Sequence, residues 1–437
     1  MSGGAVWHPY TPGTGGRELW VTSASGAWLH TRDGRKILDA IASWWVCLHG
    51  HARPEIATAI ADQANRLEQV IFAGFTHEPA EELAATLTGA APGNMQKVFF
   101  SDNGSTAVEV AIKMALQFFH LSGKPRKRIL ALRNAYHGDT FGAMSVGERG
   151  PFSAAFRDHL FEVTFLDVPY FNPLSGKIFD PSDHLEEARK ALETGDVAAV
   201  LAEPGIQGAA GMRIYPLSWL DALFGMARNH GALCLADEVF TGFFRTGTAF
   251  ATAALRHPPD ILCLSKGLTG GFMPLGLTMA NEKVAGAFAR EDYAFTLYHG
   301  HSFTGNPLAC TAALASWKLC TEPPFLARLG ESCARQKTFI QSVYSEFASC
   351  DPRFFGNISA FTLNPEDGYE YTHPLRQIIY RHFLDRNLLI RPVGNVLYLA
   401  PPFCLDPEDW NLLFSEVTQF LRNLKRKKPG QKKKPGM

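Results

Sequence analysis

The chain has 437 residues, of which 46% are hydrophobic and 19% are charged, and its 42 basic residues balance its 42 acidic residues. This composition excludes a disordered chain and is typical of a globular enzyme with a large core and about two or three domains. The absence of net charge argues against a protein whose folded part binds nucleic acid.

The N-terminal sequence lacks the basic and apolar regions of a signal peptide, and no apolar run is long enough to span a bilayer. The eight cysteines are scattered, and none forms a C-x-x-C pair. Cys234, Cys263 and Cys310 lie inside apolar runs. We therefore expect reduced, buried thiols in a cytoplasmic protein, with no disulfide framework, no metal site and no membrane contact.

The first elements along the chain are short. Residues 18–22 and 27–31 are strand-like, and an Asp-Gly pair at 33–34 predicts a hairpin. Residues 54–68 and 78–88 follow a helical pattern.

Between these elements lies an adjacent pair, Trp44 and Trp45. Adjacent residues cannot share one face of a helix or strand, so at least one ring points outward or into a cavity. One interpretation is a core tryptophan beside an interface tryptophan. The other is an aromatic wall for a long apolar substrate. His49 and His51 follow without a nearby third ligand, so we expect loop or core roles for them rather than a metal pair.

A possible phosphate site follows the predicted strand at residues 97–101. The turn after it contains Gly104 and Ser105 and leads into a helical stripe that includes Val108 and Phe119. Backbone N–H groups and hydroxyls at a helix N-terminus bind phosphate well. Serine caps many helices, so this signal is weak alone. The turn is neither a P-loop nor the glycine fingerprint of an NAD-binding enzyme.

Strands and helices alternate from about Val98 to Leu319, which predicts a doubly wound parallel sheet. Polar side chains follow several of the predicted strands. Tyr136, which could stack on a planar cofactor, and Asp139, which could fix a neighbour by hydrogen bonding, come after residues 129–132. Glu203 follows residues 197–202.

The two runs that carry most of the argument end in Asp237 and Lys266. Each run is short, apolar and stopped by a charge, which is typical of a strand buried on both faces. Ligands bind outside the carboxyl ends of such strands, so we expect both residues on one rim, one strand-loop-helix unit apart. Pyridoxal phosphate needs a lysine for its Schiff base and a carboxylate for its pyridine nitrogen. The alternative is a helix-capping aspartate and an exposed lysine, and these two runs alone do not decide between them.

The C-terminal part has the pattern of a smaller α/β domain. A glycine-rich loop at residues 299–307 precedes it, and Arg391 leaves a strand-like run within it. The planar fork of Arg391 could bind a substrate carboxylate, although an ordinary surface arginine is the default. The tail from Lys425 is basic and free of acidic residues, and we expect it to be disordered and solubilising.

Together these motifs resemble the class III pyridoxal-phosphate aminotransferases of fold type I, over nearly the whole chain from Trp7 to about Leu421. The motifs Asp237-Glu238-Val239 and Ser265-Lys266-Gly267 mark the class. Three stretches narrow the resemblance to members that transfer an amino group to 8-amino-7-oxononanoate in biotin biosynthesis: His8-Pro9-Tyr10, Ser43-Trp44-Trp45 and Tyr136-His137-Gly138-Asp139-Thr140. Another class III enzyme, acting on an ω-amino acid or a diamine, would not be expected to keep the tryptophan pair together with Tyr10 and Arg391.

The resemblance implies an α/β fold with a large domain, whose sheet is doubly wound and mostly parallel, at residues 54–320. It implies a smaller α/β domain built from residues 1–53 and 321–424, followed by a basic tail at 425–437. It also implies a homodimer with shared active sites.

The resemblance implies roles for individual residues. Lys266 would hold pyridoxal phosphate and move a proton between substrate and cofactor carbons, Asp237 would pair with the ring nitrogen, and Tyr136 would stack on the ring. The cofactor phosphate would be bound by Gly104 and Ser105 and, from the other subunit, by His301 and Ser302. The substrate pocket would be formed by Tyr10, Trp44, Trp45, Tyr136, Arg245, Lys266, Gly300 and Arg391.

In that pocket Arg391 would bind the carboxylate of the acceptor, and Asp139 and Glu203 would support the residues that touch it. S-adenosylmethionine is the usual donor of such enzymes, and some relatives use lysine. The chain departs from the family where the loop His-Gly-Pro-Thr reads His299-Gly300-His301-Ser302. Ser302 keeps a hydroxyl for the phosphate, whereas His301 replaces a stiff proline with a larger, titratable ring.

Overall fold

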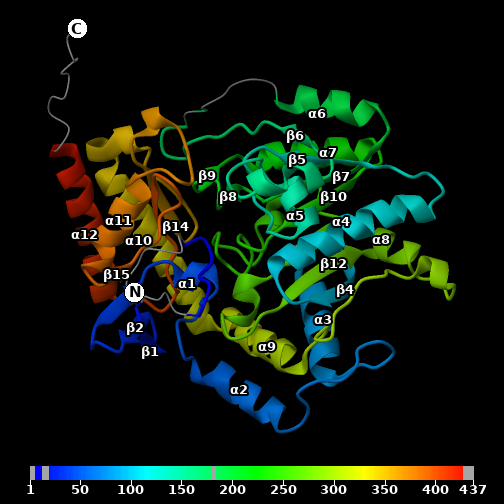
Figure 1. Ribbon diagram of the computed structural model, residues 1–437, viewed down its shortest axis with the longest axis horizontal. Helices are drawn as coiled ribbons and strands as arrows, with labels where there is room; N and C mark the ends of the chain where they lie inside the picture. Colours follow the sequence, from blue (N-terminus) through cyan, green and yellow to red (C-terminus); the bar gives the residue numbers. More distant parts are fainter. Residues whose placement is uncertain (1–4, 12–18, 177, 179–183, 427–437) are drawn as a thin grey trace.

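The computed structural model describes residues 5–11, 19–176, 178 and 184–426, and its centre is a seven-stranded sheet (Figure 1). The strand order is β4-β12-β11-β10-β7-β5-β6. Its strands are β4 (Met95–Ser101), β5 (Arg128–Leu132), β6 (Thr164–Leu166), β7 (Val197–Ala202), β10 (Leu233–Asp237), β11 (Ile261–Leu264) and β12 (Gly276–Asn281). All neighbours pair in parallel except β12, which is antiparallel to both β4 and β11. The prediction of a mostly parallel sheet is confirmed.

Helices cover both faces of this sheet. Leu233 and Leu235 of β10 pack with α4 (Gly104–Leu121), whereas Cys234 packs on the opposite face with α7 (Leu217–Asn229). Both faces of the sheet are therefore buried, which explains why the sequences of the central strands are unbroken apolar runs. The remaining helices of this part are α2 (Pro54–Ala64), α3 (Glu78–Ala90), α5 (Phe141–Val146), α6 (His184–Glu193), α8 (Glu282–Ala287) and α9 (Pro307–Thr321).

The connection from β10 to β11 differs from the expected strand-loop-helix unit. Residues 238–260 contain only one short 3-10 helix, Ala251–Ala254. The buried carboxylate of Glu238 accepts the N–H groups of Ala251 (2.7 Å) and Thr252 (2.8 Å) and so binds the start of that helix. The segment before it folds back in a tight turn, where Phe243 and Phe244 have φ of 53° and 66°. These contacts hold the segment in turns where the sequence predicts a helix.

A second sheet joins the two ends of the chain. It contains β1 (Val21–Ser25), β2 (Trp28–Thr31), β3 (Lys36–Asp39) and β15 (Leu388–Leu389). The predicted hairpin at 33–34 connects β2 to β3, and β15 pairs in parallel with β3. In Figure 1 these strands lie beside the C-terminal helix α12 (Pro407–Arg426). The pairing supports a small domain from both termini, whose boundaries stay a prediction.

The other C-terminal elements pack around a separate core. A three-stranded sheet has the order β13-β14-β16, and β8 pairs with β9 near the central sheet. The C-terminal elements are β13 (Arg353–Phe355), β14 (Ile358–Thr362), β16 (Val396–Leu399), α10 (Pro323–Phe347) and α11 (Leu375–Leu384). The short strands β8 (Ile206–Gln207) and β9 (Arg213–Ile214) follow β7 in the middle of the chain. Among the described helices, none is long and apolar enough to cross a membrane.

Candidate active site

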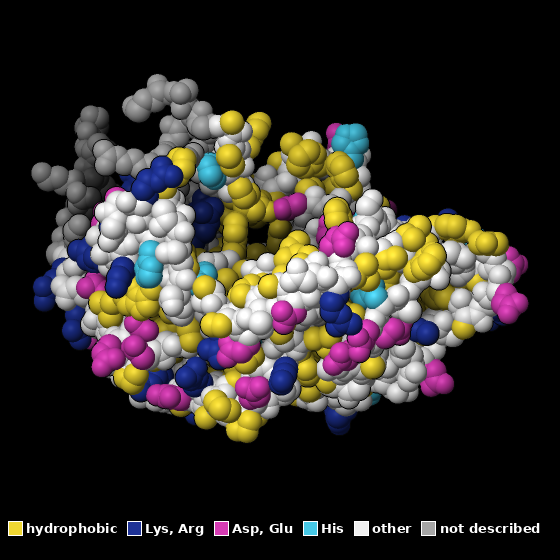
Figure 2. Space-filling view, turned by 90° about the horizontal axis from the view of Figure 1, so that it is seen from below, with side chains coloured by type: hydrophobic (Ala, Val, Ile, Leu, Met, Phe, Trp, Pro, Cys, Tyr) yellow, Lys and Arg dark blue, Asp and Glu magenta, His cyan; other side chains and the backbone are white. Residues whose placement is uncertain are grey.

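A cavity of about 750 Å³ lies at the carboxyl ends of the central strands. The face shown in Figure 2 is hollowed near its middle, and hydrophobic side chains surround the opening. The cavity is lined by the end of β10, the segment after β11, the loop after β5 and the N-terminus of α4. Its polar lining residues include Ser105, Tyr136, His137, Asp139, Glu203, Asp237, Ser265 and Lys266.

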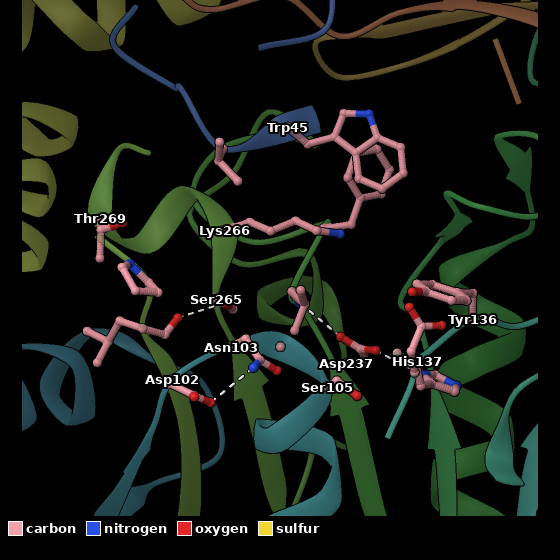
Figure 3. Close-up of a pocket in the computed structure, with 18 of the residues that line it drawn as sticks. Trp45, Asp102, Asn103, Ser105, Tyr136, His137, Asp237, Ser265, Lys266 and Thr269 are labelled. Atoms are coloured by element: carbon pink, nitrogen blue, oxygen red, sulfur yellow. Dashed lines mark hydrogen bonds and ion pairs between the residues drawn. The ribbon is translucent and has the colours of Figure 1, made fainter. Parts of the chain in front are cut away.

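Lys266 begins the short 3-10 helix Lys266–Thr269 directly after β11 and has a positive φ of 48°. Its Nζ lies 4.4 Å from the centre of the Trp45 ring and 5.7 Å from that of Phe240. Figure 3 shows the lysine extended beneath the tryptophan, with its amine toward the cavity. Burial lowers the pKa of Lys266 to about 8, although the charges of Asp237 and Glu203 oppose the shift. The amine is therefore partly neutral near physiological pH.

Asp237 lies at the base of the cavity and is 4% exposed. Its Oδ2 is 2.7 Å from the Nδ1 of His137, and its Oδ1 accepts the N–H of Val239 at 3.0 Å (Figure 3). The Nε2 of His137 has no partner within the part of the chain that the structure describes. The sequence alone predicts no role for His137, although the residue lies two positions before Asp139 in the same motif.

Glu203 is a second buried acid beside Asp237. It accepts the N–H groups of Tyr136 (3.1 Å) and Gly208 (3.2 Å). Burial raises the pKa of Glu203 to about 7, the charge of His137 opposes this shift and that of Asp237 adds to it. Glu203 therefore fixes the backbone of Tyr136 and carries a variable charge near neutral pH.

The N-terminus of α4 forms an anion cradle. Asn103 caps the helix by accepting the N–H of Thr106 at 3.0 Å. The N–H groups of Gly104 and Ser105 precede the first helical hydrogen bond and have no acceptor among the described residues. Gly138 has φ of 124°, and a Cβ there would lie 2.2 Å from the Ser105 hydroxyl. This glycine lets the loop after β5 close against the cradle.

An aromatic cluster stands over one side of the cavity. The hydroxyls of Tyr10 and Tyr136 are 3.1 Å apart, and that of Tyr10 donates to Asp139. Burial raises the pKa of both tyrosines, so both keep their protons at neutral pH. Phe152 contacts both rings, with centroid distances of 5.5 and 6.0 Å, and Tyr371 lies 4.5 Å from Phe152. Sequence reasoning missed these last two, because nothing distinguishes them from core aromatics.

The tryptophan pair lies in a left-handed turn. Ala42, Ser43, Trp44 and Trp45 have φ of 49°, 45°, 70° and 76°. Side chains oppose this hand by roughly 1–2 kcal/mol per residue, so the surrounding contacts must hold the turn.

The turn places the two rings in different surroundings. Trp45 is buried and lines the cavity, and its indole N–H donates to the Tyr398 hydroxyl at 3.1 Å. Trp44 faces Tyr10 at 5.5 Å and the guanidinium of Arg391 at 5.0 Å. The ring of Trp45 lines a cavity, which is one of the two outcomes that the adjacency of the tryptophans allows.

Seven residues expected at the site do not line this cavity. Tyr10, Trp44 and Arg391 contact one another beside it. Arg245 is 1% exposed and donates from Nη1 to the carbonyls of Ala400 (3.1 Å) and Pro401 (2.8 Å). Burial lowers the pKa of Arg245 to about 10. The remaining three, Gly300, His301 and Ser302, lie in the loop before α9, where the Ser302 carbonyl accepts from Gln69 at 2.8 Å. Their assignment to the other subunit's site stays a prediction.

The two early histidines have structural partners. His49 is buried and its Nε2 lies 3.1 Å from both the carbonyl and the hydroxyl oxygen of Ser316. His51 pairs with Asp39 at 2.9 Å. Among the described residues, no group of side chains has the arrangement of a metal site.

A family model described as aminotransferase class-III matches residues 11–421. The chain belongs to the class-III aminotransferases. It is 46% identical over 423 residues to the adenosylmethionine-8-amino-7-oxononanoate aminotransferase of Synechococcus elongatus, covering 95% of this chain and 98% of that protein. The enzyme of the same name from Geobacter sulfurreducens is 36% identical over 434 residues, covering 96% of each chain.

Solved structures of this family share the fold. The crystal structure of adenosylmethionine-8-amino-7-oxononanoate aminotransferase from Methanocaldococcus jannaschii has a TM-score of 0.89 and 32% identity, covering 96% of this chain and 97% of that one. An amine transaminase from an uncultivated Pseudomonas species, in its PLP-bound form, has a TM-score of 0.86 and 32% identity, covering 97% and 99%.

The cavity of this class-III aminotransferase suits pyridoxal phosphate in three separate places. The free N–H groups of Gly104 and Ser105 suit a phosphate. The buried carboxylate of Asp237 suits a protonated ring nitrogen, and the amine of Lys266 suits an aldehyde. All four residues line the same cavity, so one molecule could meet them together.

Proposed function

We propose that the protein transfers an amino group to 8-amino-7-oxononanoate, giving 7,8-diaminononanoate in biotin biosynthesis. Pyridoxal phosphate would be the cofactor and S-adenosyl-L-methionine the donor. The relatives from Synechococcus and Geobacter, which carry the name of this activity, support the proposal. The observation that carries it is the aromatic slot beside Lys266, where Trp45 lines the cavity and Trp44 lies under Arg391.

Pyridoxal phosphate, when bound, supplies an electron-withdrawing ring that stabilises negative charge on the substrate carbon and carries the amino group between substrates. Asp237 would hold a proton on the ring nitrogen, and His137 would orient that carboxylate through their 2.7 Å contact. Gly104 and Ser105 would hold the phosphate through their N–H groups, and Tyr136 would lie against the ring.

Lys266 would anchor the cofactor covalently and act as the proton carrier. In the first half-reaction its Nζ would take a proton from the donor carbon and pass a proton to the cofactor carbon. In the second it would take a proton from the cofactor carbon and pass one to the acceptor carbon. The lowered pKa of Lys266, about 8, leaves part of the amine neutral and able to accept a proton near neutral pH. Trp45 and Phe240 lie over the amine and would exclude water from it.

The acceptor is a carbon chain that ends in a carboxylate far from the reacting carbonyl. Such a molecule needs an apolar slot with a cation at its far end. Trp44, Trp45 and Tyr10 would form the slot, and Arg391 would bind the carboxylate through its planar fork. The structure gives Arg391 no carboxylate partner among the described residues, so its charge would be available to the substrate.

A homodimer in the cytoplasm completes the proposal. Ile71, Phe75 and Phe303 are 65%, 61% and 64% exposed, which is unusual for large apolar side chains unless another surface covers them. They belong to segments that the Gln69–Ser302 hydrogen bond joins. A second copy seated there would cover them and would bring His301 and Ser302 toward its own active site.

A second candidate is an aminotransferase of the same family that acts on an ω-amino acid or a diamine. The PLP-bound amine transaminase, which is as similar in sequence as the Methanocaldococcus enzyme, favours it. Such an enzyme would use the same Lys266 and Asp237. A diamine has no carboxylate, so an enzyme that acts on diamines would not need a cation at the far end of the slot.

The test is a pair of half-reactions on purified protein loaded with cofactor. S-adenosylmethionine should remove the visible absorbance band of the lysine-bound cofactor, and 8-amino-7-oxononanoate should restore it. Lysine serves as the alternative donor, and a diamine and an ω-amino acid serve as alternative substrates. A band that responds only to the last two would support the second candidate and would contradict the proposed function.

A further inference from the structure

Asp39 is a buried carboxylate at the end of β3 that the reaction described above does not use. Its side chain is 0% exposed. Its Oδ1 accepts the N–H of Ile41 at 3.1 Å, and its Oδ2 accepts the hydroxyl of Ser43 at 2.8 Å and lies 2.9 Å from the Nε2 of His51. One carboxylate thus binds the residue before the left-handed turn, a residue inside it and a histidine after it.

The left-handed turn needs side-chain contacts of this kind to hold it. Backbone hydrogen bonds close it from Trp45 N–H to the Ile41 carbonyl (2.8 Å) and from Val46 N–H to the Ala42 carbonyl (2.9 Å). Bonds of the same spacing also close a right-handed turn, which L-residues prefer, so they do not choose the hand. The hydroxyl of Ser43 favours the observed hand, because it lies inside the turn and must face Asp39 to donate to the buried carboxylate.

His51 fixes the carboxylate from the other end. Its own backbone is bound to the turn between β1 and β2, where its N–H donates to the carbonyl of Gly26 at 2.6 Å. Its side chain is 13% exposed, so the contact with Asp39 is largely shielded from water. Without a partner of this kind, a fully buried carboxylate would take up a proton or rearrange.

The same strand end also reaches the cationic side of the slot. Asp39 pairs with Leu389 of β15, and the N–H of Ala40 donates to the Leu389 carbonyl at 3.2 Å. Arg391 follows two residues later and lies over Trp44. Asp39 therefore stands where the two walls of the slot, the tryptophan turn and the arginine segment, are joined.

We propose that Asp39 and His51 are a positioning pair that holds the Trp44–Trp45 turn in its left-handed form and thereby determines how tightly the long acceptor binds. This inference deepens the proposed function and rests on it. Asp39 and His51 have no hydrogen bond to Lys266 or Asp237, so the donor half-reaction should depend on the pair far less than acceptor binding does.

The test compares His51→Ala, His51→Gln and Ser43→Ala with His30→Ala as a matched control. Gln places its amide nitrogen near the position of the histidine Nε2 and can restore the bond to Asp39. His30 lies on the same sheet, and its Nδ1 bonds to Ser23 at 3.3 Å, away from the turn. Ser43→Ala removes one hydroxyl only and carries the test if His51→Ala does not fold.

We expect His51→Ala and Ser43→Ala to raise the KM for 8-amino-7-oxononanoate about tenfold, the value of one lost hydrogen bond. The rate of the donor half-reaction should fall by a smaller factor, although Trp45 of the same turn lies over Lys266. His51→Gln should restore the KM to near its wild-type value. Equal losses in both half-reactions, or a KM for His51→Ala that matches that of His30→Ala, would overturn the proposal.

A second readout needs no turnover. In protein labelled with 5-fluorotryptophan, the resonances of residues 44 and 45 are assigned from Trp44→Phe and Trp45→Phe. Both should shift in His51→Ala and Ser43→Ala and return in His51→Gln, whereas unchanged resonances would contradict the positioning role. If the wild type does not accept 8-amino-7-oxononanoate, the proposed function fails, and these resonances still decide whether the pair holds the turn.

Discussion

The imidazole of His137 touches the carboxylate of Asp237 at 2.7 Å, and both side chains are buried. A carboxylate that must stay ionised beside a cofactor ring gains from a donor on its other oxygen, because burial alone would favour its protonated form. We therefore expect the histidine to act on the cofactor through Asp237, and this effect would be measurable at the cofactor.

We expect His137→Ala to weaken cofactor retention and to slow both half-reactions by about 10–100-fold, as loss of an outer hydrogen-bond partner commonly does. His137→Asn, which can place an amide N–H near the Nδ1 position, should recover part of the loss. Release of the cofactor on dialysis and the visible spectrum measure the effect. His257→Ala is the control, since His257 pairs with Asp221 at 3.2 Å away from the cavity. Cofactor retention equal to that of the control would remove the proposed role of His137.

Replacing Lys266 tests the anchor. We expect Lys266→Ala to lose the absorbance band of the lysine-bound cofactor and nearly all turnover, because no other lysine lines the cavity within the described residues. Lys190→Ala on α6, whose ammonium lies 3.6 Å from Glu186 at the surface, should leave both unchanged. A visible spectrum of Lys266→Ala like that of the wild type would place the anchor elsewhere.

The charge of Glu203 should set the pH dependence of proton transfer. The Lys266 amine accepts a proton only when neutral, so the rate of the donor half-reaction should rise with pH and level off above a pKa of about 8. The charge of Glu203 raises the pKa of Lys266. In Glu203→Gln that contribution is absent, so the rise should occur at lower pH. A single-turnover rate profile from pH 6 to 10 measures this, and an unshifted profile would contradict the coupling.

Arg391 and Trp44 allow a matched comparison of two stacked arginines. We expect Arg391→Ala to raise the KM for 8-amino-7-oxononanoate by about 10–100-fold, the value of a charge-assisted hydrogen bond, with little change in the donor half-reaction. Arg32 lies over Trp20 at 3.9 Å outside the cavity, and Arg32→Ala is the control. Equal losses in the two half-reactions of Arg391→Ala would argue against a carboxylate clamp.

The central sheet was predictable because its reactive residues come directly after short apolar strands. Asp237 and Lys266 each end a strand that is buried on both faces, and such runs are visible in a sequence. Strand β12 was not predictable from the sequence, because it begins at Gly276 and glycine is a poor strand former. That glycine is required where the strand passes the α4 N-terminus, since a Cβ there would lie 2.2 Å from the Asn103 carbonyl oxygen.

The side chains that long-range packing positions were less accessible from sequence. The environment of Arg245 could not be predicted from the sequence, because its guanidinium bonds to the carbonyls of Ala400 and Pro401, more than 150 positions away. The hand of the tryptophan turn was equally hidden, since none of its four residues is a glycine. Asp39, which accepts from both sides of that turn, is likewise an ordinary strand-end acid in the sequence.

The pairing of His51 with Asp39 should appear in the pH dependence of stability. Burial opposes a charge on His51, but its bonds to Asp39 and Cys47 and their charges raise its pKa to about 10. A pKa raised on folding adds stability that is complete below the unfolded value of about 6.5 and is lost as pH rises through 10. The contribution is on the order of a few kcal/mol, since each pKa unit corresponds to ~1.4 kcal/mol.

Denaturant unfolding at pH 6 and pH 9.5 should therefore show a larger loss of stability for the wild type than for His51→Gln, which has no proton to lose. Groups elsewhere titrate equally in both proteins and cancel in the difference. Parallel stabilities at the two pH values would mean that His51 is neutral in the folded protein and that its bond to Asp39 carries no ionic contribution.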